Sequence, residues 1–282
     1  MKINSISASH SEYPDSLTEL FKKPNPLYVI GSLPTDRKMV AIVGTRKPTQ
    51  YGKTVTHDIA SKLAERGVVI VSGLAHGIDS IAHEAALSVG GLTVAVLPGG
   101  LDAIYPASHH GLAERIIKSG GTLVSEYPAG TPPLQHRFLE RNRIVTGLSQ
   151  AVIVTEAGAK SGTMNTTAHA LEQGRDVYAV PGPITSAMSL GSNALIAQGA
   201  APIVSIDTFI KELLGDDSGS QSSLLAQTEP ERLVLELIGD GISDGDEIAH
   251  KAKLSTNEYH QIMTMLEIRG VVRSLGGNKW SL

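Results

Sequence analysis

The chain has 282 residues, of which 41% are hydrophobic, a formal net charge of −4 and no cysteine. This length accommodates one large domain and a smaller one, and the lack of cysteine excludes disulfides, thiolate zinc sites and cysteine nucleophiles. The negative balance gives no support to nucleic-acid binding by bulk charge, so such binding requires a local basic patch. No apolar run approaches the roughly 20 residues of a membrane span, and the first ten residues lack a signal-peptide core, so we expect a cytoplasmic protein without a membrane partner.

Residues 1–38 are predicted to be a lead-in that packs on the main body of the protein. They contain one short helical pattern, formed by Leu17, Leu20 and Phe21, followed by a stretch with two prolines. This is too little sequence pattern for a separate domain.

Residues 39–43 form a short apolar run that predicts a buried parallel strand. Gly44 and Thr45 follow where the chain must turn, and Arg46 adds a planar guanidinium that suits phosphate. The next segment predicts a helix, because Val55, Ile59 and Leu63 recur every four residues before Gly67. A strand, a glycine turn and a helix in this order can present backbone N–H groups to a phosphate. An ordinary turn is the alternative.

Further strand patterns follow at regular intervals, with helical segments between them. They lie at residues 68–71, 93–97, 122–125, 151–155, 177–180 and 203–206, and a helical segment at 207–214 closes the series. This alternation predicts an α/β domain over residues 39–214, with a Rossmann-like, doubly wound and mostly parallel sheet. The Gly-x-Gly-x-x-Gly fingerprint is missing after the first strand, so we expect no nicotinamide cofactor. No other cofactor and no metal are expected.

In such a sheet the ligand lies beyond the carboxyl ends of the strands, where the strand order reverses. Glycine, hydroxyl and charged residues gather at these ends, at Gly44-Thr45-Arg46, Ser72-Gly73, Pro98-Gly99-Gly100, Glu126 and Glu156. Turns between strands and helices need glycine in any case. That need does not explain why hydroxyl and charged residues recur beside the glycines.

A basic segment lies between the fourth and fifth predicted strands. Within seven residues it contains Arg137, Phe138, Arg141, Asn142 and Arg143. Arginine and asparagine can contact phosphates and base edges, and a phenylalanine ring can stack on an unpaired base. The alternative is a solvated helix start, with the ring in the core and some arginines paired with Glu126, Glu140 or Glu156. Downstream, Ser161-Gly162-Thr163 precedes a predicted helix and forms a second candidate anion cradle.

Taken together, these motifs resemble the bacterial DNA-processing protein A family, also called Smf, over residues 13–205. The matching segments are 44–46, 72–79 with His83, 100–102 with Tyr105-Pro106, 125–127, Phe138 with 141–143, 174–177 with Pro181-Gly182, 191–193 and 199–200. The resemblance implies a non-enzymatic protein that binds single-stranded DNA during natural transformation. Such a protein protects incoming strands and helps to load the RecA recombinase, usually as a homodimer.

The resemblance also implies site residues: phosphate contacts at Gly44, Thr45 and Arg46, and a positive stacking patch in the basic segment. With the residues selected above, the expected DNA-binding set is Gly44, Thr45, Arg46, Ser72, Gly73, Arg137, Phe138, Arg141, Asn142, Arg143, Ser161, Gly162 and Thr163. The chain departs from the family in two respects. We expect no room before the sheet for the helical N-terminal domain that the family often carries, and Leu139 stands where proline is usual.

The competing interpretation is an enzyme on the same sheet, of the phosphoribohydrolase type that cleaves nucleoside monophosphates. Ser161-Gly162-Thr163 resembles the core of its Pro-Gly-Gly-x-Gly-Thr-x-x-Glu motif, but Thr166 occupies the position of the glutamate. The carboxylate that this chemistry needs is therefore missing there, and we expect no catalytic residues. An unpaired Glu126 or Glu156 in a cleft would favour the enzyme.

Residues 215–228 are polar and rich in serine and glycine, which predicts a flexible linker. Residues 229–282 then combine three helical patterns with a hairpin around Gly276-Gly277-Asn278, which predicts a winged helix. Acidic residues outnumber basic ones in this domain, and its third helix offers few cations. We therefore expect a role in protein interaction or dimer support, and the acidity argues against a regulator that binds double-stranded DNA through the winged helix.

Overall fold

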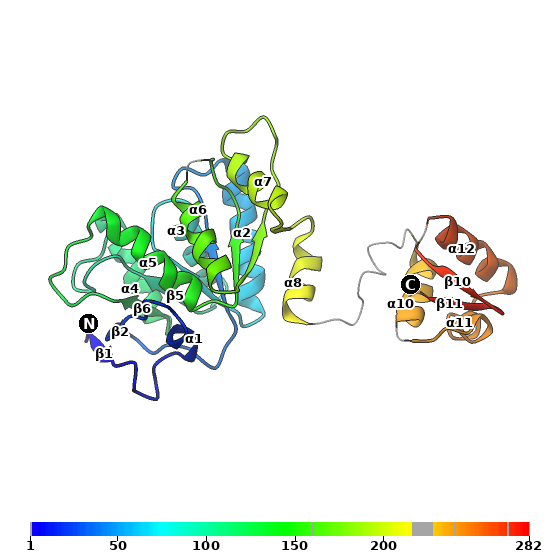
Figure 1. Ribbon diagram of the computed structural model, residues 1–282, viewed down its shortest axis with the longest axis horizontal. Coiled ribbons are helices and arrows are strands. Elements are labelled where there is room, and N and C mark those ends of the chain that lie inside the picture. Colours follow the sequence, from blue (N-terminus) through cyan, green and yellow to red (C-terminus); the bar gives the residue numbers. More distant parts are fainter. Residues whose placement is uncertain (1, 160, 216–227, 240, 270, 282) are drawn as a thin grey trace. The chain divides into compact units, whose positions relative to one another are not determined.

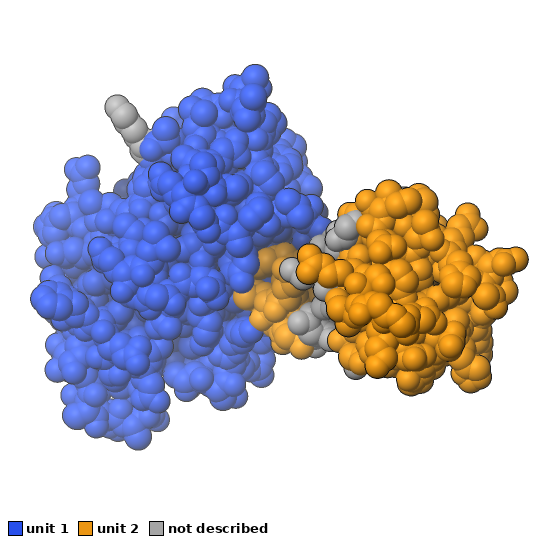
Figure 2. Space-filling model, turned by 45° about the vertical axis from the view of Figure 1, so that its right-hand side comes forward, with its two compact units in different colours: residues 1–206 blue, residues 207–282 orange. Residues whose placement is uncertain are grey.

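The computed structural model describes residues 2–159, 161–215, 228–239, 241–269 and 271–281. The chain divides into two compact units, residues 1–206 and 207–282, which are coloured separately in Figure 2. Apart from Gly215 and Thr228, the predicted linker lies outside the described residues. Among the helices of the described segments, none has the length and apolar character needed to cross a membrane.

A nine-stranded sheet forms the centre of the first unit (Figure 1). In spatial order its strands are β1 (Asn4–Ile6), β2 (Leu27–Ile30), β6 (Thr122–Ser125), β5 (Thr93–Val96), β4 (Val69–Ser72), β3 (Met39–Val43), β7 (Ala151–Val154), β8 (Asp176–Ala179) and β9 (Ala201–Pro202). Neighbours from β6 to β9 pair in parallel, whereas β1 and β2 are antiparallel. The predicted α/β class, with a doubly wound and mostly parallel sheet, is confirmed.

Both edges of the sheet differ from the prediction. The lead-in contributes β1 and β2, which are only three and four residues long and therefore too short to show a periodic pattern. The predicted strand at residues 203–206 is wrong, because the chain pairs with β8 only at Ala201–Pro202. Pro202 has no N–H for the ladder, and Val204 is 76% exposed, so the apolar run that follows does not form a buried strand.

Helices cover both faces of the sheet. On one face, α1 (Asp15–Thr18), α5 (Gln135–Gly147) and α6 (Gly162–Glu172) contribute Leu17, Ile144 and Ala170 to a core with alternate strand residues such as Val94 and Val96. On the other face, α4 (His110–Lys118) packs on Ala95 and Leu123, which point the opposite way. There α3 (Ile78–Ser88) lies between α4 and α2 (Gln50–Glu65). Helices η1 (Ala107–His109) and α7 (Leu190–Ala197) also lie in the first unit, whereas α8 (Ile206–Leu214) belongs to the second unit from Asp207 onward.

The strand order reverses between β3 and β7. After β3 the chain adds β4, β5 and β6 on one side of the sheet, and it then crosses to β7, β8 and β9 on the other side. The loops that follow β3 and β7 therefore lead away from each other at the carboxyl edge, which opens a crevice between them. The fold thus creates a binding crevice at the position that the sequence analysis selected.

The second unit contains α10 (Glu229–Gly239), α11 (Gly245–Lys251), α12 (Thr256–Ile268) and a hairpin of β10 (Arg273–Gly276) and β11 (Lys279–Ser281). Helix α12 begins with a capping box, in which Ser255 and Glu258 each bond the other's backbone N–H. Val234, Ile248 and Leu266 form part of the hydrophobic core of the second unit. This arrangement confirms the predicted winged-helix fold.

Candidate functional site

A cleft of about 680 Å³ lies at the carboxyl ends of β3 and β7, and we call it the switch-point cleft. It brings together most of the residues that the sequence analysis selected. These are Gly44, Thr45, Arg46, Gly73, Phe138, Arg141, Asn142, Ser161, Gly162 and Thr163. They come from the turns after β3 and β4, from helix α5 and from the start of α6, so one pocket unites four separate parts of the chain.

A cation and aromatic rings lie next to one another in this cleft. The guanidinium carbon of Arg46 is 5.4 Å from the centre of the Phe138 ring, within the range of a cation–π contact. Tyr105 also contacts the Phe138 ring in an edge-on arrangement, with the two ring centres 5.4 Å apart. Arg46 and Tyr105 are exposed and Phe138 is partly exposed. Phe138 therefore offers ring surface to a ligand instead of filling the core.

Arg141 is a buried cation in the lining of the cleft, with 4% of its surface exposed. Its Nη1 donates to the carbonyl oxygens of Gly73 and Val96. The Asp79 carboxylate accepts from the backbone N–H groups of Gly73 and Ala75, at 3.2 and 3.4 Å. Burial raises the pKa of Asp79 and lowers that of Arg141 to about 10, and the opposite charge of each opposes the other's shift. Arg141 therefore holds the carboxyl end of β4 in place.

Position 73 requires glycine for this arrangement. A Cβ atom there would lie 2.1 Å from Nη1 of Arg141, closer than any real contact. Gly73, which was predicted to bind phosphate, therefore also supports the fold, because its backbone N–H donates to Asp79 and its carbonyl accepts from Arg141.

The N-terminus of α2 is already occupied by a carboxylate. Glu156, which is 2% exposed, accepts from the backbone N–H of Thr49 at 2.8 Å and from its hydroxyl at 2.7 Å. The carbonyl oxygen of Glu156 also accepts from the N–H of Thr45, at 2.8 Å. An anion at a helix N-terminus is favourable, and here the chain supplies its own. The Thr49 N–H at this helix start and the Glu156 carboxylate are thus already bonded to each other.

The start of α6 offers a different environment. Ser161 is its N-cap and accepts from the N–H of Thr163 at 3.2 Å, while the two hydroxyls are 2.8 Å apart. Gly162 is exposed, and in the described segments no carboxylate bonds to this helix start. Of the two predicted anion cradles, this one remains open to a ligand.

Three of the predicted residues lie outside the switch-point cleft. Ser72 is fully buried, and its hydroxyl donates to the carbonyl of Ile42, which ties β4 to β3. Arg137 lies over the Tyr127 ring, 4.8 Å from its centre, and donates to the carbonyl of Pro132. Arg143, the third, faces the opposite side of α5.

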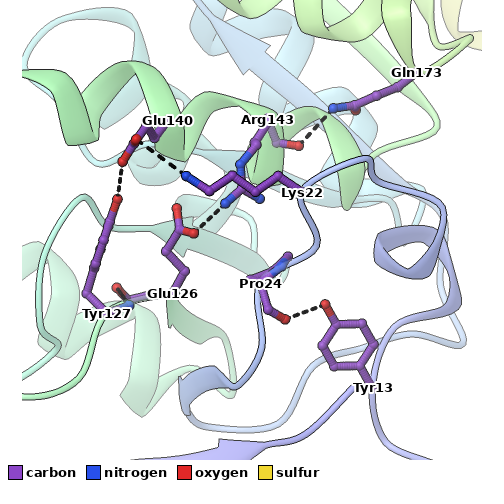
Figure 3. Close-up of polar contacts among 9 residues, drawn as sticks. Tyr13, Lys22, Pro24, Glu126, Tyr127, Glu140, Arg143 and Gln173 are labelled. Carbon is purple, nitrogen blue, oxygen red and sulfur yellow. Dashed lines mark hydrogen bonds and ion pairs between the residues drawn. The ribbon is translucent and has the colours of Figure 1, made fainter. Parts of the chain in front are cut away.

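Arg143 belongs to a polar cluster under the lead-in (Figure 3). Its guanidinium pairs with Glu126, with both side chains almost fully buried, so the pairing that the sequence left open is found. Burial raises the pKa of Glu126, and the charge of Arg143 opposes that shift. Nearby, Glu140 accepts from the Tyr127 hydroxyl at 2.6 Å and lies 3.6 Å from the Lys22 ammonium. The charge of Arg143 is therefore compensated inside the fold, on the side of α5 that lines no part of the switch-point cleft.

A second cleft, of about 660 Å³, adjoins this cluster and is lined by the lead-in together with α5 and α6. We call it the lead-in cleft. Phe21 is fully exposed at it, and Arg143 and Arg175 contribute to its lining. Leu139, the residue at the family's proline position, lines both clefts, so α5 forms the wall between them.

The described lining of the switch-point cleft contains few groups that could act as an acid, a base or a metal ligand. Among its described lining residues, Asp79 is the only carboxylate, and it is held by two backbone N–H groups beside Arg141. No cluster of three or more histidine, aspartate or glutamate side chains that could hold a metal occurs in the part of the chain that the structure describes. The cleft instead offers an aromatic ring, an exposed arginine and an open helix start.

The sequence analysis did not select several residues of this cleft. Lys47 follows Arg46 directly, and this second cation was the one available signal. Met188 lies 3.9 Å from the Thr45 hydroxyl, and Ala187 and Leu190 lie beside it in the lining. That segment is more than a hundred residues away in the chain and carries no recognisable motif, so only the fold reveals it.

Comparison with known families and proteins gives one consistent result. Residues 4–214 match the family described as DNA recombination-mediator protein A, and residues 219–278 match the DprA winged helix domain. The chain is 42% identical over 269 residues to the putative DNA processing protein DprA of Mycobacterium tuberculosis, covering 92% of this chain and 69% of that protein. It is 37% identical to protein Smf of Escherichia coli, covering 96% of this chain and 75% of that protein.

Two solved structures are similar in both fold and sequence. DNA processing protein A from Helicobacter pylori, described for its single-stranded DNA binding mode, is 36% identical with a TM-score of 0.70, covering 77% of this chain and 97% of that one. The DprA structure from Streptococcus pneumoniae is 40% identical with a TM-score of 0.68, covering 73% of each chain.

Proposed function

Because this chain belongs to the DNA recombination-mediator protein A family, we propose that it binds single-stranded DNA in its switch-point cleft during DNA processing in natural transformation. The observation that carries the proposal is the contact between Arg46 and Phe138 in that cleft. It places a phosphate-binding fork beside a ring on which an unpaired base can stack. The H. pylori relative, described for its single-stranded DNA binding mode, supports the same ligand.

The character of the cleft favours a single strand over a duplex. Stacking on Phe138 requires a base that is free of its partner, which duplex DNA does not offer. The formal net charge of −4 provides no general attraction to DNA of either kind, so binding depends on local cations. Arg46 and Lys47 are exposed at the cleft, and no described acidic side chain forms an ion pair with either.

We assign the predicted DNA-binding residues to two groups. The group that contacts the strand comprises Gly44, Thr45, Arg46, Phe138, Asn142, Ser161, Gly162 and Thr163. Arg137, the first arginine of the basic segment, also belongs to this group and contributes charge from outside the cleft. The second group, which comprises Ser72, Gly73, Arg141 and Arg143, supports the fold through the buried contacts described above.

The same geometry disfavours a hydrolase, and we propose that the protein is not an enzyme. Glu156 caps α2, Glu126 is paired with Arg143 outside the cleft, and Thr166 remains where the related hydrolases carry glutamate. A general acid or base must reach the reacting group, and none of these three side chains offers a free carboxylate in the cleft.

Family membership supports three further assignments. We propose a cytoplasmic homodimer that helps to load the RecA recombinase on the bound strand. Light scattering tests the dimer directly, since residues 1–214 should give twice the mass of one chain. A clean monomer at micromolar concentration would contradict a dimer formed through the α/β domain.

The winged helix is proposed to serve protein contacts. Helix α12, which would enter a DNA groove, carries Glu258 and Glu267 and no lysine or arginine. Phosphate contacts in this motif depend on basic side chains, so the helix is poorly suited to a duplex. Removal of residues 229–282 should therefore leave most single-strand affinity intact. A loss of more than about tenfold, roughly 1.4 kcal/mol, would show that the domain binds DNA.

The central experiment measures binding of a fluorescent oligonucleotide to Arg46→Ala and Phe138→Ala over a range of salt concentrations. Arg46→Ala should weaken binding and reduce the log–log salt slope by about 0.7, the value for one single-strand phosphate contact. Phe138→Ala should cost about 1–3 kcal/mol with little change in slope, because stacking is not ionic. Arg115→Ala is the matched control, since Arg115 is an exposed arginine on α4 that pairs with Glu84.

The thermal stability of each variant should be measured before titration, because removal of an arginine that only supports the fold would lower thermal stability as well as affinity. Stable Arg46 and Phe138 variants that keep wild-type affinity and salt slope would refute the assignment of the cleft. The hydrolase would then be tested directly, by incubating the protein with nucleoside monophosphates and looking for released base.

A further inference from the structure

The two recognition elements of the switch-point cleft are close enough to be used by one nucleotide. Arg46 lies over the Phe138 ring at 5.4 Å, and Lys47 follows Arg46 in the same lining. A nucleotide that stacks its base on the ring keeps its own phosphate within one sugar of that base. Neighbouring nucleotides in a strand are therefore not needed to engage both the ring and the cations.

The cleft also has the dimensions of a small-molecule site. Its volume of about 680 Å³ lies within the roughly 300–1,000 Å³ that is usual for small ligands. Its wall is formed by α5, the start of α6 and the segment that contains Met188. In doubly wound sheets, the crevice where strand order reverses is the place where nucleotides bind.

The charges of the described lining suit a phosphate monoester. Such a group carries about −1.5 to −2 charges at neutral pH. Arg46 and Lys47 supply two exposed cations, whereas Asp79 balances the positive charge of the buried Arg141. The open start of α6 adds backbone and hydroxyl donors for the same group.

We propose that the switch-point cleft binds free nucleoside 5′-monophosphates, which compete with single-stranded DNA for it. The inference rests on the proposed function, because it uses the same cleft. The base stacks on Phe138, while the phosphate meets Arg46, Lys47 and the start of α6. Nucleoside monophosphates are the products of exonucleolytic DNA hydrolysis. Degradation of DNA near the protein would therefore release a competitor for the strand that it holds.

The test is displacement of a labelled oligonucleotide by thymidine 5′-monophosphate at constant ionic strength. Thymidine, 2-deoxyribose 5-phosphate and inorganic phosphate serve as partial ligands. The monophosphate should displace the strand, and deoxyribose phosphate, which lacks the base, should be at least about fivefold weaker, the lower limit for one lost stack. Direct binding without DNA, by saturation-transfer NMR, should show the strongest transfer to the base.

Variants locate the effect. Phe138→Ala should reduce the affinity for thymidine monophosphate and leave that for deoxyribose phosphate unchanged, whereas Arg46→Ala should weaken both. Arg115→Ala should change neither. If the oligonucleotide responds to Arg46→Ala but thymidine monophosphate displaces it no better than inorganic phosphate does, this inference is refuted and the proposed function stands. If the oligonucleotide does not respond to Arg46→Ala, the assignment of the cleft fails for both.

Discussion

The buried histidine of α3 makes a quantitative prediction about stability and pH. His83 is fully buried, and its Nδ1 lies 2.6 Å from the hydroxyl oxygen of Thr93. That hydroxyl donates its own proton to the carbonyl of Ile70, at 2.6 Å, so it can only accept from His83. Nδ1 therefore carries the proton, and the buried Nε2 has no partner in the described residues. His83 is thus held as a neutral imidazole.

The pKa of His83 is lowered to about 3, first by burial and then by the nearby charges of Arg141 and His109. In the unfolded chain a histidine has a pKa of 6.5, so below that pH the unfolded state takes up a proton that the folded state refuses. The contribution of neutral His83 to the stability of the folded state is therefore fully present above pH 6.5 and is lost as the pH falls toward 3. Between pH 8 and pH 5 this single group should remove about 2 kcal/mol from the free energy of unfolding.

The test compares wild type with His83→Gln, whose amide can still donate to Thr93 and does not titrate. Unfolding by denaturant is followed by far-UV circular dichroism at pH 8 and pH 5. The only tryptophan, Trp280, lies in the second unit, so its fluorescence follows that unit separately and provides an internal control. The variant should lose less stability than wild type on acidification, by about 2 kcal/mol. Equal losses in both proteins would refute the neutral, desolvated state of His83.

Two buried carboxylates, Glu156 and Glu126, give further predictions about the stability of the fold. Glu156→Gln removes the charged acceptor of Thr49 at the start of α2 and should lower the free energy of unfolding by about 1–3 kcal/mol. Denaturant unfolding at pH 7 measures this loss. An unchanged midpoint would mean that the Glu156 charge contributes nothing to stability. Breaking the pair under the lead-in, by Glu126→Gln, should cost about 3–5 kcal/mol, because Arg143 is left as an uncompensated buried charge. Thermal denaturation measures this loss, and a variant as stable as wild type would show that solvent reaches Arg143.

The centre of the fold could be predicted from the sequence because its strands are buried on both faces. Strand β3 is buried at every position, so it appears in the sequence as an uninterrupted apolar run, and β7 does likewise. The edge strands give no such signal. Strand β1 has no fully buried residue, and β9 has only two residues, both exposed. Their places depend on pairing with β2 and β8, which no local pattern encodes.

The candidate site was predictable in its location and only partly in its roles. The cleft follows from the positions of the turns, but the direction of each α5 side chain depends on what covers the helix. Phe138 and Asn142, four residues apart, line only the switch-point cleft, whereas Arg143 lines only the lead-in cleft; Leu139, four residues before Arg143, lies between the two clefts and lines both. The spacing of four residues in the sequence already indicated which of these side chains share a face of α5. The sequence could not indicate which face the lead-in covers, and so it assigned Arg143 to DNA.

The carboxylate of Glu156 has a consequence for how quickly the cleft can be filled. The Glu156 carboxylate accepts from Thr49 and the Glu156 carbonyl accepts from Thr45, so groups of the chain itself hold both ends of the turn. The turn that carries Arg46 is thus pre-organised, and binding need not spend free energy on ordering it. Association should then be limited by encounter, and its rate should fall with salt as steering weakens.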